Sequence, residues 1–313
     1  MKEGKYQSDE NQTGTKLEKE MKQLIKQIKK YKICYLFILP SITAYILFLF
    51  YPLICTFVYS FHRYTLKTYS FIGIKNYINL LSDPIFIKSI RNTLFFVVTF
   101  TPIVLLISIL AAAFIIKMNS KLRSFFMGMF YLPSITSIVT LTLVWKWIYN
   151  YRYGILNYIR SIFGYENINW LSNKHTVLPA LLILLVYLCL GMPIILLTAA
   201  MGAIPKTYSD AAKIDGATEW QVLWKITVPL IRPTVLYLMI ILMVNSFQTF
   251  LIIVLMTGGG PYYRSTTIAY QIADEAFQFS HFGVASAMGI ILLFIVSTLT
   301  LIQYKLLSKD IQY

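Results

Sequence analysis

The chain has 313 residues, of which 57% are hydrophobic and only 13% are charged, and its mean hydropathy is +0.64. Soluble domains carry a charge on about a quarter of their residues, so a water-soluble fold is excluded. The net charge of +15 does not indicate a nucleic-acid-binding domain, because the 28 Lys and Arg are spread between apolar runs and are not gathered in one segment.

Six runs of the sequence contain no Asp, Glu, Lys or Arg: residues 33–61, 92–116, 124–145, 175–205, 233–263 and 276–304. A helix needs about 20 apolar residues to cross a bilayer, so each run is long enough to be a span. A basic segment precedes the first run, as in a signal peptide, but the apolar core of a signal peptide has only about 7 to 15 residues. We therefore predict an all-α membrane protein with six transmembrane helices, the first of which is a retained anchor.

The distribution of basic residues predicts the orientation of these spans. An even number of spans places both termini on one side, and 18 of the 28 Lys and Arg fall in the segments on that side. The other ten include five in the first loop on the opposite side, between Arg63 and Arg91. Loops rich in Lys and Arg stay in the cytoplasm, so both termini are predicted to be cytoplasmic.

The chain divides into a segment before the first span, residues 1–32, and a six-span domain, residues 33–313. Residues 1–15 are polar, which is typical of a disordered tail. In residues 16–32, apolar side chains recur at helical spacing amid Lys and Glu: Leu17, Met21, Leu24, Ile25 and Ile28. This pattern fits a basic amphipathic helix on the cytoplasmic leaflet and fits a solvated lead-in to the first span equally well.

Residues 70–91, between the first two predicted spans, have the features of an ordered external cap. Ser82 or Asp83 can cap a short helix that begins at Pro84, because proline suits the first helical position.

Residues 205–229, between the fourth and fifth predicted spans, form a helix-turn-helix segment that we call the elbow. Pro205 suits the first turn of a helix, Ala211 and Ala212 favour its continuation, and Gly216 can adopt the left-handed conformation that ends it. Thr218 and Gln221 have the spacing of a capping box, which starts a second helix at once.

The second helix of the elbow carries Trp220, Leu223 and Trp224 and is predicted to end at Pro229. The first helix combines small and acidic side chains at Asp210, Ala211, Ala212, Asp215 and Ala217. Its backbone can therefore approach a groove of another protein closely, as in helix-in-groove docking.

The elbow resembles the EAA loop of binding-protein-dependent ABC importer permeases. The Glu-Ala-Ala of that family is Asp210-Ala211-Ala212 here, followed by the matching Asp215-Gly216-Ala217 and by Pro229 at the family's spacing. In the family, this loop is the coupling helix that sits in a cleft of the ATPase subunit. The resemblance thus implies that Asp210, Ala211, Ala212, Asp215, Gly216 and Ala217 couple this chain to an ATPase, with a carboxylate at residue 210 that reaches one methylene less far.

Further segments are similar to the maltose and multiple-sugar permeases: residues 71–73 (FIG), 91–93 (RNT), 256–261 (MTGGGP), 265–267 (STT), 275–277 (EAF) and 282–288 (FGVASAM). These blocks cover nearly the whole chain after about residue 35, in the family's order. The resemblance implies a type I ABC importer fold in a bacterial cytoplasmic membrane. It also implies a second permease subunit, two ATPase subunits, an extracellular sugar-binding protein and a sugar substrate.

The glycines of residues 258–260 lack the lysine and the helix of a phosphate-binding loop, and no Walker-like segment occurs in the sequence. We therefore expect ATP and Mg²⁺ to be bound by the ATPase subunits, with no cofactor, metal or catalytic residue in this chain. The glycine run itself is expected to form an external turn after the fifth span, which the family would place near a docked binding protein.

Two alternatives are an ion-coupled transporter or channel and a membrane enzyme. Ion-coupled transporters usually have buried acidic residues or His in mid-span, and the six runs contain none away from their ends. An enzyme would need clustered reactive side chains, but the three His are isolated near span ends and the three Cys lie in apolar runs without metal or redox spacing: His62, His175, His281, Cys34, Cys55 and Cys189.

A path for a polar neutral solute needs amide, hydroxyl and aromatic groups, because amides bond to sugar hydroxyls and rings stack on the apolar faces of sugars. The fifth run carries Asn245, Ser246 and Thr249, and Gly191 and Pro193 could bend the fourth. By similarity to the maltose permeases, the predicted path residues are Tyr187, Leu190, Gly191, Asn245, Ser246 and Thr249. The alternative for each polar group is that it joins helices to one another.

Overall fold

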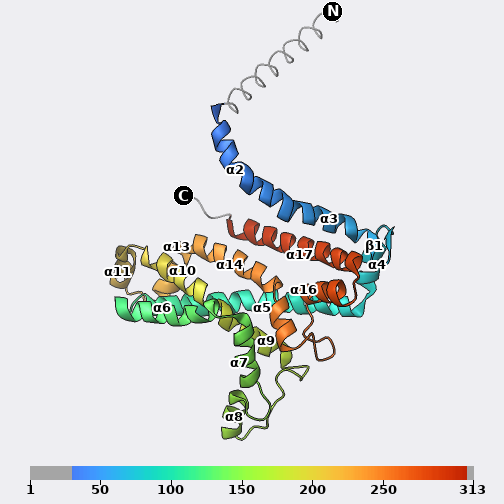
Figure 1. Ribbon diagram of the computed structural model, residues 1–313. Helices are drawn as coiled ribbons and strands as arrows, with labels where there is room; N and C mark the ends of the chain where they lie inside the picture. The colour runs from blue at the N-terminus through green and yellow to red at the C-terminus, as the bar shows by residue number, and fades with distance from the viewer. Residues whose placement is uncertain (1–29, 309–313) are drawn as a thin grey trace, which may run out of the picture. The chain divides into compact units, whose positions relative to one another are not determined.

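The computed structural model describes residues 30–308 and consists of helices joined by short connections (Figure 1). The chain forms two compact units that divide between Thr56 and Phe57. The predicted tail and nearly all of the predicted basic helix over residues 16–32 lie outside the described residues.

The first unit contains one continuous helical run made of α2 (Lys32–Tyr45), the π-helical turn η1 (Ile46–Phe50) and the start of α3 (Tyr51–Ser60). Residues Leu36–Ser60 are long and apolar enough to cross a membrane. The run is hydrophobic all round, as expected of a helix that lies in lipid. It corresponds to the first predicted span.

The second unit holds a two-stranded antiparallel sheet and the remaining helices. The sheet pairs β1 (His62–Tyr64) with β2 (Tyr69–Phe71), with Arg63 opposite Ser70. The helices are α4 (Lys75–Ser82), α5 (Pro84–Ile115), α6 (Ser120–Ile135), α7 (Ile138–Ile148), α8 (Ile155–Ile162), α9 (Val177–Cys189), α10 (Gly191–Gly202), α11 (Lys206–Ile214), α12 (Glu219–Val222), η2 (Leu223–Thr227), α13 (Val228–Leu230), α14 (Arg232–Phe247), α15 (Phe250–Met256), α16 (Ile268–Ala273), η3 (Asp274–Gln278) and α17 (Phe282–Ser308).

Three helices in the described part of the chain are long and apolar enough to span a membrane alone, and three bent helix pairs raise the number to as many as six. The unbroken ones are Leu36–Ser60, Pro84–Ile115 and Phe282–Lys305. The protein is therefore an all-α membrane protein, as predicted, but only three of its six predicted spans are unbroken.

The third predicted span, residues 124–145, is broken between α6 and α7 by a bend of 98°. Pro133 lies in the last turn of α6 and cannot donate a backbone hydrogen bond. Thr136 is extended, with φ −80° and ψ 143°, and its hydroxyl donates to the carbonyl of Leu132 over 2.8 Å. A side chain thus satisfies one carbonyl at the break, which is how membrane helices tolerate such interruptions.

The fourth predicted span bends by 48° between α9 and α10, next to Gly191 and Pro193 as expected. The fifth, residues 233–263, is not one helix, because α14 ends at Phe247 and a short α15 follows. The elbow's second helix reaches α14 through a bend of 76° at the junction of Leu230 and Arg232.

The N-terminal cap of α5 corrects one prediction. The Asp83 carboxylate accepts a hydrogen bond from the backbone N–H of Ile85 over 2.9 Å, and Pro84 is the first helical residue, as predicted. The helix is not short, however, because it runs for 32 residues into the second span and continues through Pro102. The segment before it, predicted to be an external cap, is ordered, with β1, β2 and α4.

The core lies around α5, which packs against α9, α10 and α14. Phe96, Phe100 and Val104 on α5 are buried, and so are Leu184, Leu197 and Leu238 from its neighbours. Buried polar side chains on α5 are mostly small, and the hydroxyls of Ser89 and Thr93 donate to carbonyls of their own helix. These hydrogen bonds remove the cost of a polar group in an apolar interior.

Candidate functional site: the elbow and the solute path

The elbow forms two helices, α11 and the helical segment from α12 to α13, joined by the four residues 215–218. Gly216 has φ +83°, the left-handed conformation that glycine adopts without strain. The N–H of Ala217 donates to the carbonyl of Ala212 over 2.9 Å and the N–H of Gly216 to that of Lys213 over 3.0 Å, so carbonyls at the end of α11 are satisfied. The predicted left-handed glycine is confirmed.

The capping box at the start of the second elbow helix is also confirmed. The Thr218 N–H donates to Oε1 of Gln221 over 2.8 Å, and the Gln221 N–H donates to Oγ1 of Thr218 over 3.3 Å. The prediction that Pro229 ends this helix is wrong. The preceding turn is wound as a π-helix, in which the Val228 N–H bonds to the Leu223 carbonyl, and the helix continues through Pro229 to Leu230.

The six predicted coupling residues all lie on α11 and its turn, at or near the surface. Asp210, Ala211, Asp215 and Gly216 are exposed, and Ala212 and Ala217 are half-buried. Sequence reasoning missed Ile214, which is 87% exposed at the end of α11, and Tyr208, which is 54% exposed. Tyr208, Ala211 and Ile214 recur every three residues and so share one face of the helix, which gives it exposed apolar anchors.

A charged cluster joins the elbow to the connection between α5 and α6. Glu219 accepts from Lys117 through Oε2 and from Lys213 through Oε1, each over 2.7 Å. The hydrogen bonds from Lys117 and then Lys213 lower the pKa of Glu219 to about 2. The hydrogen bond to Glu219 raises the pKa of Lys213, and the negative charge of Glu219 raises it further.

The predicted path residues separate into exposed and buried groups. Asn245 on α14 is exposed, Tyr187 on α9 is 39% exposed, and Leu190 is half-buried at the bend between α9 and α10. The Tyr187 ring packs against Trp145 of α7, with ring centres 5.5 Å apart. These three side chains have atoms that a solute could reach.

Gly191, Ser246 and Thr249 are buried in this conformation. The Ser246 hydroxyl donates to the Met243 carbonyl of its own helix over 2.6 Å. The Thr249 hydroxyl is buried and has no recorded partner among the described residues. The Ser246 hydroxyl thus bonds within its own helix and does not join two helices, and the roles of all six residues in a path remain predictions.

Gly191 marks a joint between the two bent spans, which sequence reasoning did not find. A Cβ at Gly191 would lie 2.7 Å from the Phe130 carbonyl and 2.8 Å from the Tyr131 Cα, so only glycine fits against α6. The Ser134 hydroxyl of α6 donates to the Leu188 carbonyl over 3.0 Å. The ends of α6 and α9, both next to their bends, are therefore linked directly.

The turn at residues 257–267, which is predicted to be external, is held by α5. Asn92 donates from Nδ2 to the carbonyls of Arg264 and Thr266 over 2.9 and 2.8 Å, and Lys88 donates to the carbonyl of Tyr262. Ser265 bonds to the Gly260 carbonyl within the turn. The turn is thus fixed in place and presents Tyr262, which is 88% exposed.

The family described as "Binding-protein-dependent transport system inner membrane component" matches residues 81–313. The chain belongs to this family. It is the multi-pass permease subunit of a binding-protein-dependent ABC importer, with the fold expected from its sequence.

Individual relatives agree over most of the chain. The trehalose/maltose transport system permease protein MalF of Thermococcus litoralis is 31% identical over 88% of this chain and 93% of its own. The osmoprotective compounds uptake permease protein GgtC of a Synechocystis species is 30% identical over 74% of this chain and 83% of its own. A chain of a bacterial ABC transporter that imports the acidic polysaccharide alginate is 25% identical, with a TM-score of 0.82, and covers 93% of the permease and 100% of that chain.

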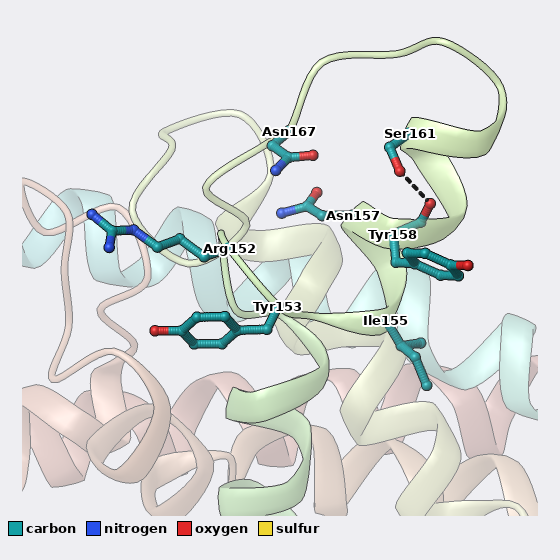
Figure 2. Close-up of a pocket in the computed structure, with 7 residues that line it drawn as sticks. All are labelled: Arg152, Tyr153, Ile155, Asn157, Tyr158, Ser161 and Asn167. Carbon is teal, nitrogen blue, oxygen red and sulfur yellow. Dashed lines mark hydrogen bonds between the residues drawn. The ribbon is translucent and has the colours of Figure 1, made fainter.

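A small pocket lies at α8 of the permease, and none of its lining residues belongs to the elbow or to the predicted path (Figure 2). Its lining residues are Arg152, Tyr153, Ile155, Asn157, Tyr158, Ser161 and Asn167. The Asn157 amide is fully used, since Nδ2 donates to three backbone carbonyls and Oδ1 accepts from Ile168 and Trp170. The pocket is therefore explained by the packing of the loop around α8, and we assign it no ligand.

Residues 30–308 contain no group of three or more His, Cys, Asp or Glu that could hold a metal ion. His281 is paired through Nδ1 with Oε2 of Glu275 over 2.8 Å, and His62 is within 2.8 Å of the Val58 carbonyl. Each of these two histidines thus makes a contact with a residue close to it in the sequence.

Proposed function

We propose that this permease imports a di- or oligosaccharide across the bacterial cytoplasmic membrane. It would form half of the path beside a second, homologous permease chain, with both of its termini in the cytoplasm. ATP and Mg²⁺ would be bound and ATP hydrolysed by two separate ATPase subunits, so the chain itself would have no enzymatic activity. An extracellular binding protein would deliver the sugar.

The observation that carries this proposal is the exposed elbow helix α11 in a chain that matches a sugar permease along most of its length. Asp210, Ala211, Asp215 and Gly216 present charge and accessible backbone, and Ile214 adds an apolar anchor. Such a helix suits a groove of a partner. The exposed Tyr187 and Asn245 supply the ring and the amide that a neutral sugar needs.

The test is ATPase stimulation in the reconstituted complex of both permeases, the ATPase subunits and the binding protein. A panel would compare di- and oligosaccharides with an acidic oligosaccharide and with small osmoprotective compounds. We expect neutral di- or oligosaccharides to give the largest stimulation. Stimulation by osmoprotective compounds alone would contradict the substrate class but not the importer mechanism.

A further inference from the structure

Three segments of the permease meet at the carboxylate of Glu219. Glu219 is the first residue of α12, Lys213 lies in the last turn of α11, and Lys117 follows the end of α5. Each carboxylate oxygen accepts from a different lysine over 2.7 Å, so both contacts form at the same time. The contact between Glu219 and Lys117 joins residues 102 positions apart in the chain.

The turn that presents Lys117 is itself held by hydrogen bonds. Arg123 donates from Nη2 to the carbonyls of Ile116 and Met118 over 2.6 and 3.2 Å. The Asn119 side chain accepts from the Leu122 N–H over 3.0 Å and so caps α6. The position of the Lys117 backbone is therefore fixed relative to α5 and α6.

The helix that Lys117 follows, α5, is the one around which the core is built. Its cytoplasmic end leads to Lys117, and its external end holds the turn at residues 257–267 through Asn92. In Figure 1, α5 extends from α4 and α16 at one end to the neighbourhood of α6 and α11 at the other. A movement passed to α5 at the elbow can thus reach the external turn through one rigid helix.

We propose that Glu219 is a positioning residue that fastens the elbow to α5 through Lys117, so that movement of the elbow moves α5. Lys213 keeps the two elbow helices together by sharing the same carboxylate. The proposal rests on the elbow's proposed role in coupling to the ATPase. Movement of the elbow would then reach the spans through this ionic contact as well as through the covalent connections to α10 and α14.

A simpler role for Glu219 is to stabilise the N-terminus of α12, where an acidic side chain is favourable. That role would not require a contact with Lys117, whose Nζ lies 2.7 Å from Oε2 of Glu219. A substitution of Lys117 therefore separates the two roles, because it removes the fastening and leaves every residue of the elbow unchanged.

The experiment compares Lys117→Gln with Lys121→Gln in the reconstituted complete transporter. Lys121 is the next lysine, is exposed on α6 and has no recorded partner among the described residues, so its substitution removes the same charge. The measurement is the ratio of ATPase rates with and without the binding protein, loaded with whichever panel sugar stimulates the unmodified complex most. We expect Lys117→Gln to lower this ratio about two- to fivefold, the range that one exposed ion pair can supply, and Lys121→Gln to leave it unchanged.

Two further measurements distinguish fastening from misfolding. Lys117→Arg keeps the charge and should restore the ratio. Salt screens exposed charges, so raising the salt concentration should lower the ratio of the unmodified complex towards that of Lys117→Gln, whose own ratio should change less. Equal ratios for Lys117→Gln and Lys121→Gln would overturn the fastening while leaving the elbow's coupling role intact. If the elbow did not couple to the ATPase at all, substitution of Gly216 would leave the stimulation of ATPase activity by the binding protein undiminished.

Discussion

Gly216 shows how one residue determines the shape of the elbow. Its φ of +83° lies in the left-handed region, and a Cβ there would meet no atom within 4 Å. The requirement for glycine is therefore one of backbone conformation and not of space. The neighbouring Thr218 starts the next helix through its capping box, so the direction of the chain changes within the four residues between α11 and α12.

Substitution of Gly216 should uncouple the transporter in proportion to backbone strain. Alanine costs about 1–2 kcal/mol in the left-handed region, and proline cannot adopt it because its ring fixes φ near about −65°. We expect Gly216→Ala to reduce binding-protein-stimulated ATPase activity partly and Gly216→Pro to abolish it. Gly128→Ala is the control, since a Cβ there meets nothing within 4 Å and φ is ordinary. Full stimulation in Gly216→Pro would contradict the coupling role of the elbow.

The charges around Glu219 predict a pH dependence at the same scale. The pKa of Glu219 is lowered from 4.5 to about 2. The stability that its ionised form gives to the folded elbow is therefore complete above about pH 4.5 and is lost as the pH falls towards 2. The pKa of Lys213 is raised above 10.5, so its contribution is complete below that value. The loss of stimulation caused by Lys117→Gln should therefore be equal at about pH 6 and about pH 8 when assayed side by side. A loss that grows between these values would require another titrating group.

At the scale of elements, the main difference between the predicted and the observed spans is that several spans are bent, which the apolar runs of the sequence do not show. The third and fourth predicted spans are bent by 98° and 48°, and α6 and α9 are joined beside their bends by Ser134 and Leu188. Gly191 lets the backbones approach at the same place. The two bends are therefore parts of one joint between helices.

Ser134→Ala should loosen this joint. The Leu188 carbonyl would lose its donor in an apolar region, which costs about 1 kcal/mol. We expect a lower melting temperature of the purified complex, which Ser134→Thr should largely restore because it keeps the hydroxyl. Ser161→Ala is a matched control, since that hydroxyl bonds only to the Tyr158 carbonyl of its own helix. Equal melting temperatures for the two alanine variants would show that the hydrogen bond contributes nothing.

The contrast between the elbow and the joint explains what could be predicted from sequence. Gly216, Thr218 and Gln221 act on residues within a few positions, so their chemistry is visible in the sequence and the turn was predicted correctly. Ser134 bonds to a residue 54 positions away and Lys117 to one 102 positions away. These contacts depend on how helices pack, which composition and periodicity do not encode. The continuation of the helix through Pro229 was missed because a π-helical turn accommodates the proline.

At the scale of the whole molecule, the path depends on surfaces that this chain would share with the second permease. Asn245 and Tyr187 remain accessible in the single chain, whereas Ser246 is turned into its own helix. Asn245 is therefore the predicted path residue whose substitution should give the clearest result.

We expect Asn245→Ala to reduce sugar uptake at least about tenfold, because a site built around a hydrogen bond discriminates strongly when one partner is lost. Co-purification of the ATPase subunits should be unchanged, since Asn245 lies near the end of α14 that is farther from the elbow. Thr300→Ala is a suitable control, because its hydroxyl bonds to the Val296 carbonyl within α17. Normal uptake by Asn245→Ala in proteoliposomes would remove Asn245 from the path.

The double attachment of α5 also limits how the chain can change in length. A residue inserted into an α-helix shifts everything beyond it by about 1.5 Å and turns it by about 100°. An insertion or deletion between Asn92 and Lys117 would thus turn one attachment away from its partner, whichever end stayed in place. Among homologous permeases, the number of residues between Asn92 and Lys117 should therefore be constant.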